Sequence, residues 1–412
     1  MRLRFFIIGT LGLILLTFAL TSFFYAKATN SGKKNRKPFT IFMTLLALIG
    51  LSGFSYMTYN FVQTKYLARH ERQAEQLIDN TTGEKITTKA NAKERLVLPT
   101  AYNTVETTHP SVVAFPEKWH GYKYWMAVTS YPKGDAAKEN PHIFGSNDLV
   151  TWEAANDLKN PLDEPKSKEF DQDNNPKQYD SDTHIVYNKE KDRLEVFWRY
   201  VDDIKQEAII YRADTLDGKT WSDKKITNRG PRKTDDWVSP AFVKDESGYK
   251  VWYVANGYRI WYRESQDGQT WTKPVEVNVP YENKTANMHH WHLDVQKIEG
   301  KYEMILVGSK QEGEKPDLEE RHVMNLYHSS SPDGKQWTDL TPIIYPSQKK
   351  EAWDGRGIYR SCFIKENGKY YVFYSGIGFD DTRGIGLSYG ADINNLTGVD
   401  MSNYADLHKK IK

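Results

Sequence analysis

Hydrophobic and polar residues follow two different patterns along the chain. Residues 5–25 and 39–59 form apolar runs without a charge, whereas from about residue 96 short alternating segments are separated by turn residues. An uncharged run of about 20 residues predicts a membrane-spanning helix, and alternation with a period of two predicts β-strands. The expected parts are a membrane anchor of two transmembrane helices (1–62), a short stalk and linker (63–95), a β domain (96–400) and a C-terminal tail (401–412).

The segment between the two apolar runs is basic and predicts the orientation of the chain. Five cations lie there, against Arg2 and Arg4 at the N-terminus: Lys27, Lys33, Lys34, Arg36 and Lys37. Because cytoplasmic loops are enriched in Lys and Arg, we expect this segment inside, the protein in the cell membrane, and the main domain extracytoplasmic. Residues 1–28 can also be interpreted as a cleaved signal peptide, with a basic start and an Ala26-Lys27-Ala28 end.

A short motif of a hydroxyl residue, an Asp and a Trp recurs four times in the β domain. The copies occupy residues 146–152, 215–221, 265–271 and 331–337. In three of them an Asp-Gly pair supplies a tight turn, because Gly tolerates a positive φ and Asp can bond back to the backbone. We expect the Trp to pack over the turn and to begin the next strand.

Ahead of each turn lies a Tyr/Trp-rich hairpin, and ahead of that a strand with a polar start. Five such starts occur, near His109, Asp182, Val238, His292 and Arg360. Repeat units of about 50 to 70 residues with four short strands each are typical of propeller blades. The sequence therefore predicts an all-β domain, a five-bladed β-propeller.

This architecture resembles the five-bladed propeller glycoside hydrolases of family 43 and their relatives in families 32 and 68, over about residues 100–395. In that family the inner strand of each blade starts at a central funnel, where the substrate binds. The resemblance implies an Asp-Pro with a general base or nucleophile in the first blade and an orienting carboxylate in the second. It also implies a general-acid Glu two residues before a Pro in the third.

The chain departs from that pattern at two of the three positions. His109 stands before Pro110 in the first blade, and Val238 stands two residues before Pro240 in the third. Asp182 keeps the carboxylate of the second blade. The resemblance also makes His292, with His290 as alternative, the counterpart of a histidine that helps to hold an axial metal.

The polar starts supply the candidate site residues. We expect Asp182 to act with a loop acid, Glu139, Asp235 or Asp236, in the missing catalytic role. The expected substrate-binding residues are His109, His184, Ser239, His290, Trp291, Asp354 and Arg360. A divalent metal on the propeller axis, calcium or another, is a further expectation, with His292 as its ligand. On a regular strand His290, His292 and Asp294 would share one face.

The amino-acid composition limits the classes of molecule that the protein is expected to bind. Aromatic residues make up 13% of the chain, with 12 Trp and 26 Tyr, and such rings both form strands and stack on sugars. The single cysteine, Cys362, excludes an internal disulfide. A net charge of +2 without a basic stripe argues against nucleic acid.

The leading hypothesis is a membrane-anchored, glycan-processing protein that cleaves glycosidic bonds of a cell-surface or exported polysaccharide. The alternative is a non-catalytic carbohydrate-binding propeller that assists polysaccharide assembly, and the two replaced carboxylates favour it. The third hypothesis is a lyase or transferase that uses a histidine as its base.

Overall fold

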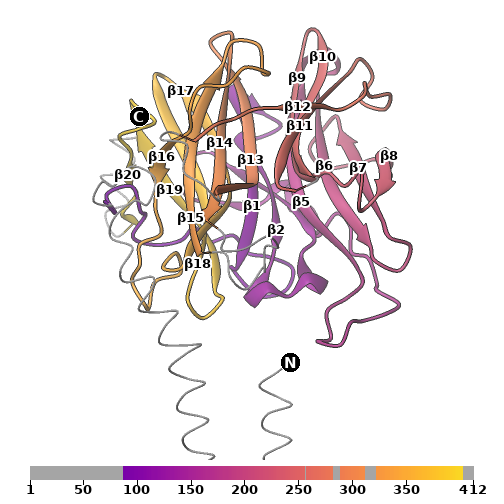
Figure 1. The fold of residues 1–412 in the computed structure, drawn as a ribbon, viewed down its shortest axis with the longest axis horizontal. Coiled ribbons are helices and arrows are strands. Elements are labelled where there is room, and N and C mark those ends of the chain that lie inside the picture. Colours follow the sequence, from indigo (N-terminus) through magenta and orange to yellow (C-terminus); the bar gives the residue numbers. More distant parts are fainter. Residues whose placement is uncertain (1–86, 256, 282–287, 311–321, 402–412) are drawn as a thin grey trace, which may run out of the picture. The chain divides into compact units, whose positions relative to one another are not determined.

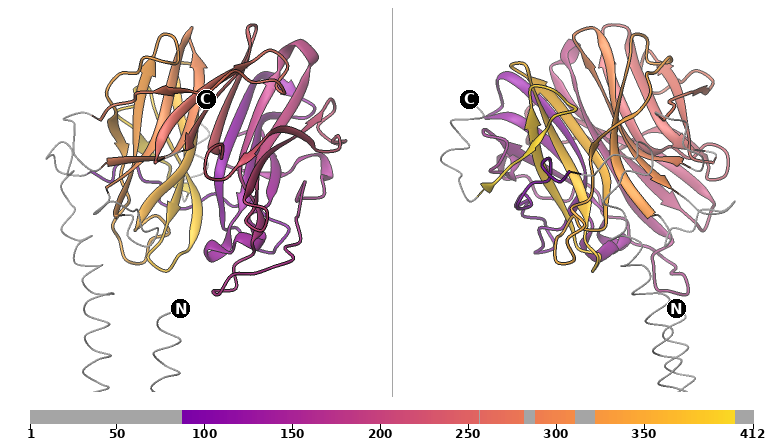
Figure 2. Two further views of the ribbon diagram at one scale, coloured as in Figure 1. Left: turned by 45° about the vertical axis from the view of Figure 1, so that its right-hand side comes forward. Right: turned by 60° about the vertical axis from the view of Figure 1, so that its left-hand side comes forward.

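The computed structural model describes residues 87–255, 257–281, 288–310 and 322–401. Within these ranges the chain forms five four-stranded sheets, each built from four consecutive strands that pair antiparallel (Figures 1 and 2). The innermost strands of neighbouring sheets contact one another in a closed ring, from the first sheet to the fifth and back to the first. The fold is thus a five-bladed β-propeller, as predicted.

The strands follow the chain blade by blade. Blade 1 holds β1 (Thr107–Trp119), β2 (Tyr122–Ser130), β3 (Pro141–Ser146) and β4 (Glu153–Ala154). Blade 2 holds β5 (Gln178–Asn188), β6 (Arg193–Asp202), β7 (Glu207–Thr215) and β8 (Lys225–Pro231). Blade 3 holds β9 (Val238–Asp245), β10 (Gly248–Ala255), β11 (Arg259–Ser265) and β12 (Val275–Val277). Blade 4 holds β13 (Met288–Ile298), β14 (Lys301–Lys310), β15 (His322–Ser331) and β16 (Thr341–Ile344). Blade 5 holds β17 (Gly357–Glu366), β18 (Lys369–Ile377), β19 (Arg383–Gly390) and β20 (Thr397–Gly398).

Short 3-10 turns occupy some of the connections between strands. They are η2 (Pro132–Gly134), η3 (Ala136–Lys138), η4 (Ala155–Asp157) and η5 (Lys189–Lys191). The first two lie in the loop between β2 and β3, which carries Glu139 toward the axis.

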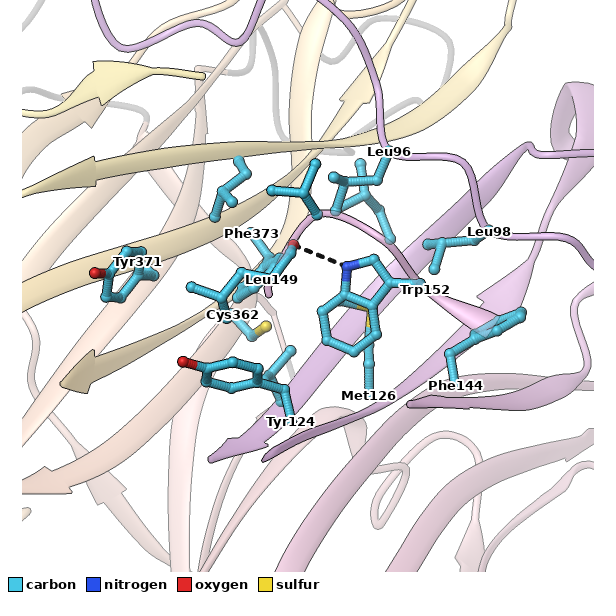
Figure 3. Close-up of a cluster of buried hydrophobic side chains, with 14 of the residues drawn as sticks. Leu96, Leu98, Tyr124, Met126, Phe144, Leu149, Trp152, Cys362, Tyr371 and Phe373 are labelled. Carbon is cyan, nitrogen blue, oxygen red and sulfur yellow. Dashed lines mark hydrogen bonds between the residues drawn. The ribbon is translucent and has the colours of Figure 1, made fainter. Parts of the chain in front are cut away.

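The hydrophobic core is divided into five parts, one between each pair of adjacent blades. The part between blades 1 and 5 includes Met126, Trp152 and Phe373 (Figure 3). Each blade buries one face against each of its two neighbours, so no blade has a core of its own. A single blade is therefore stable only as part of the closed ring.

The repeated motif forms the turn before the fourth strand of blades 1 to 4. In blade 3 the Asp267 carboxylate accepts the backbone N–H groups of Gln269 and Thr270, and these bonds hold the pKa of that carboxyl below its usual range. The indole of Trp152 donates back to the carbonyl of Leu149 within its own turn (Figure 3). The Trp packs over the turn as predicted, but it precedes the fourth strand, which begins at Glu153 in blade 1.

A segment ahead of the first strand is bound to blade 5. Lys93 N–H donates to the carbonyl of Val399, Leu96 N–H donates to that of Ile385, and Ala92 N–H donates to the Tyr374 hydroxyl. Leu96 packs in the core between blades 1 and 5 (Figure 3). The polar linker expected up to residue 95 therefore gives way to propeller structure several residues earlier.

In the ranges that the structure describes, no helix combines the length and apolar character that crossing a bilayer requires. Both predicted spans and most of the stalk lie outside the described residues.

Candidate functional site

The same irregularity occurs in the inner strand of every blade. In blade 1 Thr108 pairs with Thr129 and Ser111 with Ala127, so two residues of β1 face one of β2. The two-residue bulges are His109-Pro110, Asp182-Thr183, Ser239-Pro240, Trp291-His292 and Arg360-Ser361. A β-bulge bends its strand and re-aims a side chain. These five bulges build the site.

Three of the bulges contain a residue with a left-handed backbone. φ is 54° at His109, 52° at Asp182 and 54° at Ser239, whereas Trp291 and Arg360 stay outside this region. Such conformations cost of order 1 kcal/mol or more for residues other than Gly, and they persist where the surrounding structure imposes them. Two of these three residues, His109 and Asp182, bring their side chains together.

His109, Asp182 and His292 converge in a buried cluster. One ligand-capable atom from each lies within 4.8 Å of the other two. The Asp182 Oδ1 atom is 3.6 Å from His109 Nε2 and 3.6 Å from His292 Nδ1. All three residues are at most 2% exposed. Of the three histidines at the polar strand starts that we expected to converge on the axis, His109, His184 and His292, the structure brings His109 and His292 together with Asp182, whereas His184 pairs with Asp294.

The His109 ring is oriented by contacts on its other nitrogen. Nδ1 lies 2.9 Å from the Thr129 hydroxyl, 3.3 Å from Glu139 Oε1 and 3.4 Å from the Asp182 backbone N–H. Because the two oxygen atoms are nearer, and the Thr129 hydroxyl itself donates to the carbonyl of Thr108, we place the ring proton on Nδ1. The Nε2 lone pair then faces Asp182 and His292.

Burial controls the protonation states around this ring. It lowers the pKa of His109 to about 3, against the opposing pull of Asp182, so the imidazole is neutral at neutral pH. Burial, together with the negative charge of Asp182, raises the pKa of Glu139 well above its usual range. Burial thus favours the protonated form of Glu139 and the neutral form of the His109 imidazole.

Two arginines flank Asp182. Arg199 Nη1 lies 3.9 Å from Asp182 Oδ2 and donates to the Ser181 hydroxyl at 3.1 Å, while Asp236 holds the rest of its guanidinium. Arg360 Nη1 is 3.5 Å from Asp182 Oδ1, and its Nη2 donates to the carbonyl of Pro240 at 2.8 Å. Asp236, predicted as a catalytic acid, thus acts on the cluster through Arg199.

A second polar pair lies further along the inner strands. His184 Nε2 is 3.0 Å from Asp294 Oδ1, and His184 Nδ1 accepts the backbone N–H of Phe242. Asp294 Oδ2 also accepts the backbone N–H of Phe363. These bonds link blades 2, 3, 4 and 5, so His184, predicted as a sugar contact, joins blades instead of facing the cluster.

Aromatic rings surround the cluster. The Tyr359 ring centroid is 4.1 Å from that of His292 and 5.3 Å from that of His109. Trp291 lies 4.9 Å from His292, and Tyr131 stacks 6.5 Å from His109. Partly exposed rings of this kind are suited to the apolar face of a sugar.

The bulge in β13 overturns the prediction that His290, His292 and Asp294 share one face. His290 pairs with Gly308 and Leu293 with Leu306, two positions apart, so His290 shares its face with Leu293 and not with Asp294. The His290 nitrogens face the carbonyls of Tyr258 and Val279. His290 is therefore not part of the proposed site.

Three other predicted site residues make structural contacts. Asp354 accepts hydrogen bonds from the Tyr374 hydroxyl and the Asn91 side chain, both 2.9 Å, and so fastens the N-terminal segment to blade 5. The Ser239 hydroxyl accepts the Leu293 N–H at 3.3 Å and joins blade 3 to blade 4. Asp235 pairs with Arg263 at 2.6 Å, away from Asp182.

Sequence reasoning missed four residues at the site: Tyr131, Arg199, Tyr359 and Arg383. Tyr359 directly precedes the bulge of blade 5, which has no mark in the sequence. Tyr131 follows β2, Arg199 lies within β6 and Arg383 begins β19, and no sequence signal marks the proximity of these positions to the axis.

The donor set of the cluster fits a divalent cation. Two imidazoles and a carboxylate are common ligands of catalytic metals. His109 Nε2 and Asp182 Oδ1 are buried and make no hydrogen bond among the described residues, so a cation would satisfy both atoms. The Arg360 charge opposes a cation, so the fit rests on the donor set and on these unpaired atoms.

A separate cavity of about 290 Å³ lies beyond the cluster along the same five inner strands. Lys244, Lys297 and Lys365 line it, and each is paired with an acid at 3.1, 2.6 and 3.1 Å respectively. Its basic residues are therefore already neutralised.

Fold and site together define a five-bladed propeller that resembles family 43 glycoside hydrolases, with two histidines and one carboxylate at its axis. The chain is 28% identical over 308 residues to an A type blood N-acetyl-α-D-galactosamine deacetylase from Flavonifractor plautii. The match covers 64% of this chain and 38% of that protein, so the chain spans well under half of the relative's length. No family model matches the chain.

Solved structures show the same fold. An N-acetylgalactosamine deacetylase from F. plautii, in complex with blood group B trisaccharide, superposes with a TM-score of 0.64 at 22% identity, covering 78% of this chain and 97% of that one. A structure described as a glycoside hydrolase superposes with a TM-score of 0.50 at 16% identity, covering 78% and 94%.

Proposed function

We propose that the protein is a metal-dependent deacetylase that hydrolyses the N-acetyl group of an amino sugar in a glycan. The observation that carries the proposal is the convergence of His109, Asp182 and His292 from three blades. The deacetylase relative and the aromatic surroundings of the cluster support the choice of an N-acetylated sugar. The proposal also places the protein in the cell membrane, with the propeller outside the cytoplasm, and includes partners in polysaccharide assembly.

In this mechanism His109, Asp182 and His292 hold the cation. When bound, the cation polarises the amide carbonyl and lowers the pKa of a water molecule. Water adds to the carbonyl carbon, the C–N bond breaks, and the products are acetate and a free amine. Arg199 orients Asp182, while Thr129 and Glu139 hold the Nδ1 proton of His109. We assign to Glu139 the transfer of a proton to the leaving amine, and the proton that the water molecule loses on addition restores the acid form of Glu139.

Glycosidic cleavage by Asp182 and Glu139 is the second candidate, because both carboxyl groups are at the axis and Glu139 suits a general acid. The His109 ring separates them, since Glu139 approaches Nδ1 and Asp182 approaches Nε2. Glycosidic cleavage by two carboxyl groups gives the two histidines beside Asp182 no chemical role, whereas metal-dependent hydrolysis uses both as ligands. This geometry favours the deacetylase.

The test measures acetate and new reducing ends released from glycans that contain N-acetylgalactosamine or N-acetylglucosamine. Full-length protein is treated with EDTA and reloaded with Mn²⁺, Zn²⁺ or Ca²⁺. The expected result is acetate release that is lost with EDTA, restored by one cation, and abolished in His292→Gln and Asp182→Asn. His328→Gln is the matched control, since His328 lies on β15 of the same blade and pairs with Glu303.

Three outcomes separate the hypotheses. Reducing ends without acetate would establish a glycoside hydrolase instead. Glycan binding without either product would establish a carbohydrate-binding propeller. Acetate release that persists in the metal-stripped protein and in His292→Gln would refute the metal site.

A further inference from the structure

Arg383 is a buried arginine beside the cluster, and two of its three guanidinium nitrogens have no hydrogen-bond acceptor among the described residues. Its residue exposure is 8%, and its Nε and Nη1 atoms are buried and make no hydrogen bond among the described residues. Burying a guanidinium without acceptors is costly. Such a group is expected where a ligand supplies the missing oxygens.

The side chain is directed into the site by its neighbours. Its guanidinium lies over the Tyr131 ring at 5.3 Å, and that ring stacks near His109. A Cβ added at Gly134 would lie 3.3 Å from Nη2, so the η2 turn leaves just enough room for the guanidinium. The positive charge acts on the cluster, where it is one of the influences that lower the pKa of His109, after burial.

The backbone of Arg383 is held independently of its side chain. Its N–H donates to Glu106 at 2.9 Å, and its carbonyl accepts from Arg95 at 2.7 Å. The placement of the strand therefore does not depend on the guanidinium.

The charge of Arg383 is only partly balanced. Its nearest carboxylate, Asp381, is 3.8 Å from Nη1 and 51% exposed. Asp381 makes a shorter ion pair, 2.7 Å, with Arg356. Asp381 therefore balances the charge of Arg383 only in part.

We propose that Arg383 binds an oxyanion on the substrate, so that the preferred glycan is acidic and carries a carboxylate or phosphate near the N-acetyl group. This deepens the proposed function, on which it rests for the position of the substrate. The planar guanidinium matches the oxygens of either anion. Tyr131, on which the guanidinium lies, limits its movement.

The test compares binding of matched probes by titration calorimetry with full-length, metal-loaded protein. The first probe is an oligosaccharide of alternating N-acetylhexosamine and uronic acid, and the second is the same oligosaccharide with its carboxyl groups reduced to alcohols. A third, the neutral one bearing a phosphate ester, distinguishes phosphate from carboxylate. Arg259→Gln, an exposed arginine paired with Glu276, is the control.

The wild type is expected to bind one acidic probe about tenfold or more tighter than the neutral one, which is the size expected of a charge-assisted hydrogen bond. Arg383→Gln should bring that ratio close to one with little change for the neutral probe, and Arg259→Gln should keep it. Equal binding of all probes by the wild type, or no binding of any, would overturn the proposal. So would a preference that survives in Arg383→Gln.

Stability gives a second readout. Arg383→Met should melt at or above the wild-type temperature, because it removes an unpaired buried charge. A lower melting temperature would assign Arg383 a structural role. Because the binding ratio and acetate release are separate measurements, a preference for acidic probes without acetate release would refute the deacetylase and leave the anion site standing.

Discussion

Arg199 and Asp236 form a paired contact in which Nε and Nη2 of the arginine each donate to one carboxylate oxygen at 2.7 Å. The remaining Nη1 is thereby aimed at Ser181 and Asp182. Although burial acts to raise the pKa of Asp236, Arg199 holds it below its usual range, so Asp236 stays charged. Asp236, which the sequence suggested as a catalytic acid, therefore acts indirectly. It positions Arg199, and Arg199 in turn contacts Asp182.

Asp236→Asn should weaken metal binding by about 10- to 100-fold, the usual effect of losing a group that orients a ligand. The amide no longer neutralises Arg199, whose charge then acts more strongly on Asp182. Calorimetric titration with Mn²⁺ or Zn²⁺ measures the change. Asp203→Asn is the control, because Asp203 pairs with Arg232 and makes no contact with Asp182. An unchanged metal affinity with a lowered melting temperature would indicate a structural role only.

Glu139→Gln should lower kcat for acetate release by about 100-fold or more, within the range for loss of a general acid. The amide still reaches His109 Nδ1, so metal affinity should change much less. The measurement is turnover at saturating metal and substrate, beside calorimetry. Near-normal turnover would remove Glu139 from the mechanism.

Two glycine substitutions separate backbone strain from steric overlap. Gly368 has φ +73° with no atom within 4 Å of an added Cβ, so Gly368→Ala should cost about 1–2 kcal/mol from the left-handed backbone alone. Gly218 has φ +68°, but its Cβ would lie 2.3 Å from Trp125, so Gly218→Ala should cost about 2–5 kcal/mol. Urea unfolding measures both. Equal losses would show that Trp125 moves aside freely.

Acid should destabilise the fold through buried neutral histidines. Burial lowers the pKa of His142 to about 4, and the ring is held neutral between the Ala101 N–H and the Asn140 carbonyl. In the unfolded chain the residue takes up a proton below about pH 6.5, so the unfolded state binds more protons between about pH 6.5 and 4. The free energy of unfolding therefore falls as pH falls through this window.

His142→Gln removes that titration. Its unfolding free energy should be lower than the wild type's at pH 8, and the gap should narrow by up to about 1.4 kcal/mol per pH unit below pH 6.5. Urea unfolding at pH values from 4.5 to 8 tests this. Parallel curves for the two proteins would mean that His142 is protonated equally in both states.

The propeller was predictable because each blade repeats local signals. The turn around Asp267 and the hairpin that precedes it are specified within a few residues, so they can be read without tertiary information. The meeting of His109 and His292 was expected because both stand at the polar start of a blade, but the sequence did not show that His184 would pair with Asp294 instead of joining them. A bulge carries no such mark, and this is why the face of His290 was assigned wrongly. Arg383 begins a third strand, and its proximity to Tyr131 arises only from the packing of blade 5 against blade 1.

In this protein the pairing of the inner strands does not depend on which side chains the five bulges present. Each presents a side chain at one backbone position near the axis, and the strands around it pair in the same way whether that side chain is imidazole, carboxylate, hydroxyl, indole or guanidinium. Exchange at a bulge therefore alters the reaction while leaving the scaffold in place. The five bulges therefore offer protein engineers five positions at which a side chain can be replaced one at a time without a change in strand pairing.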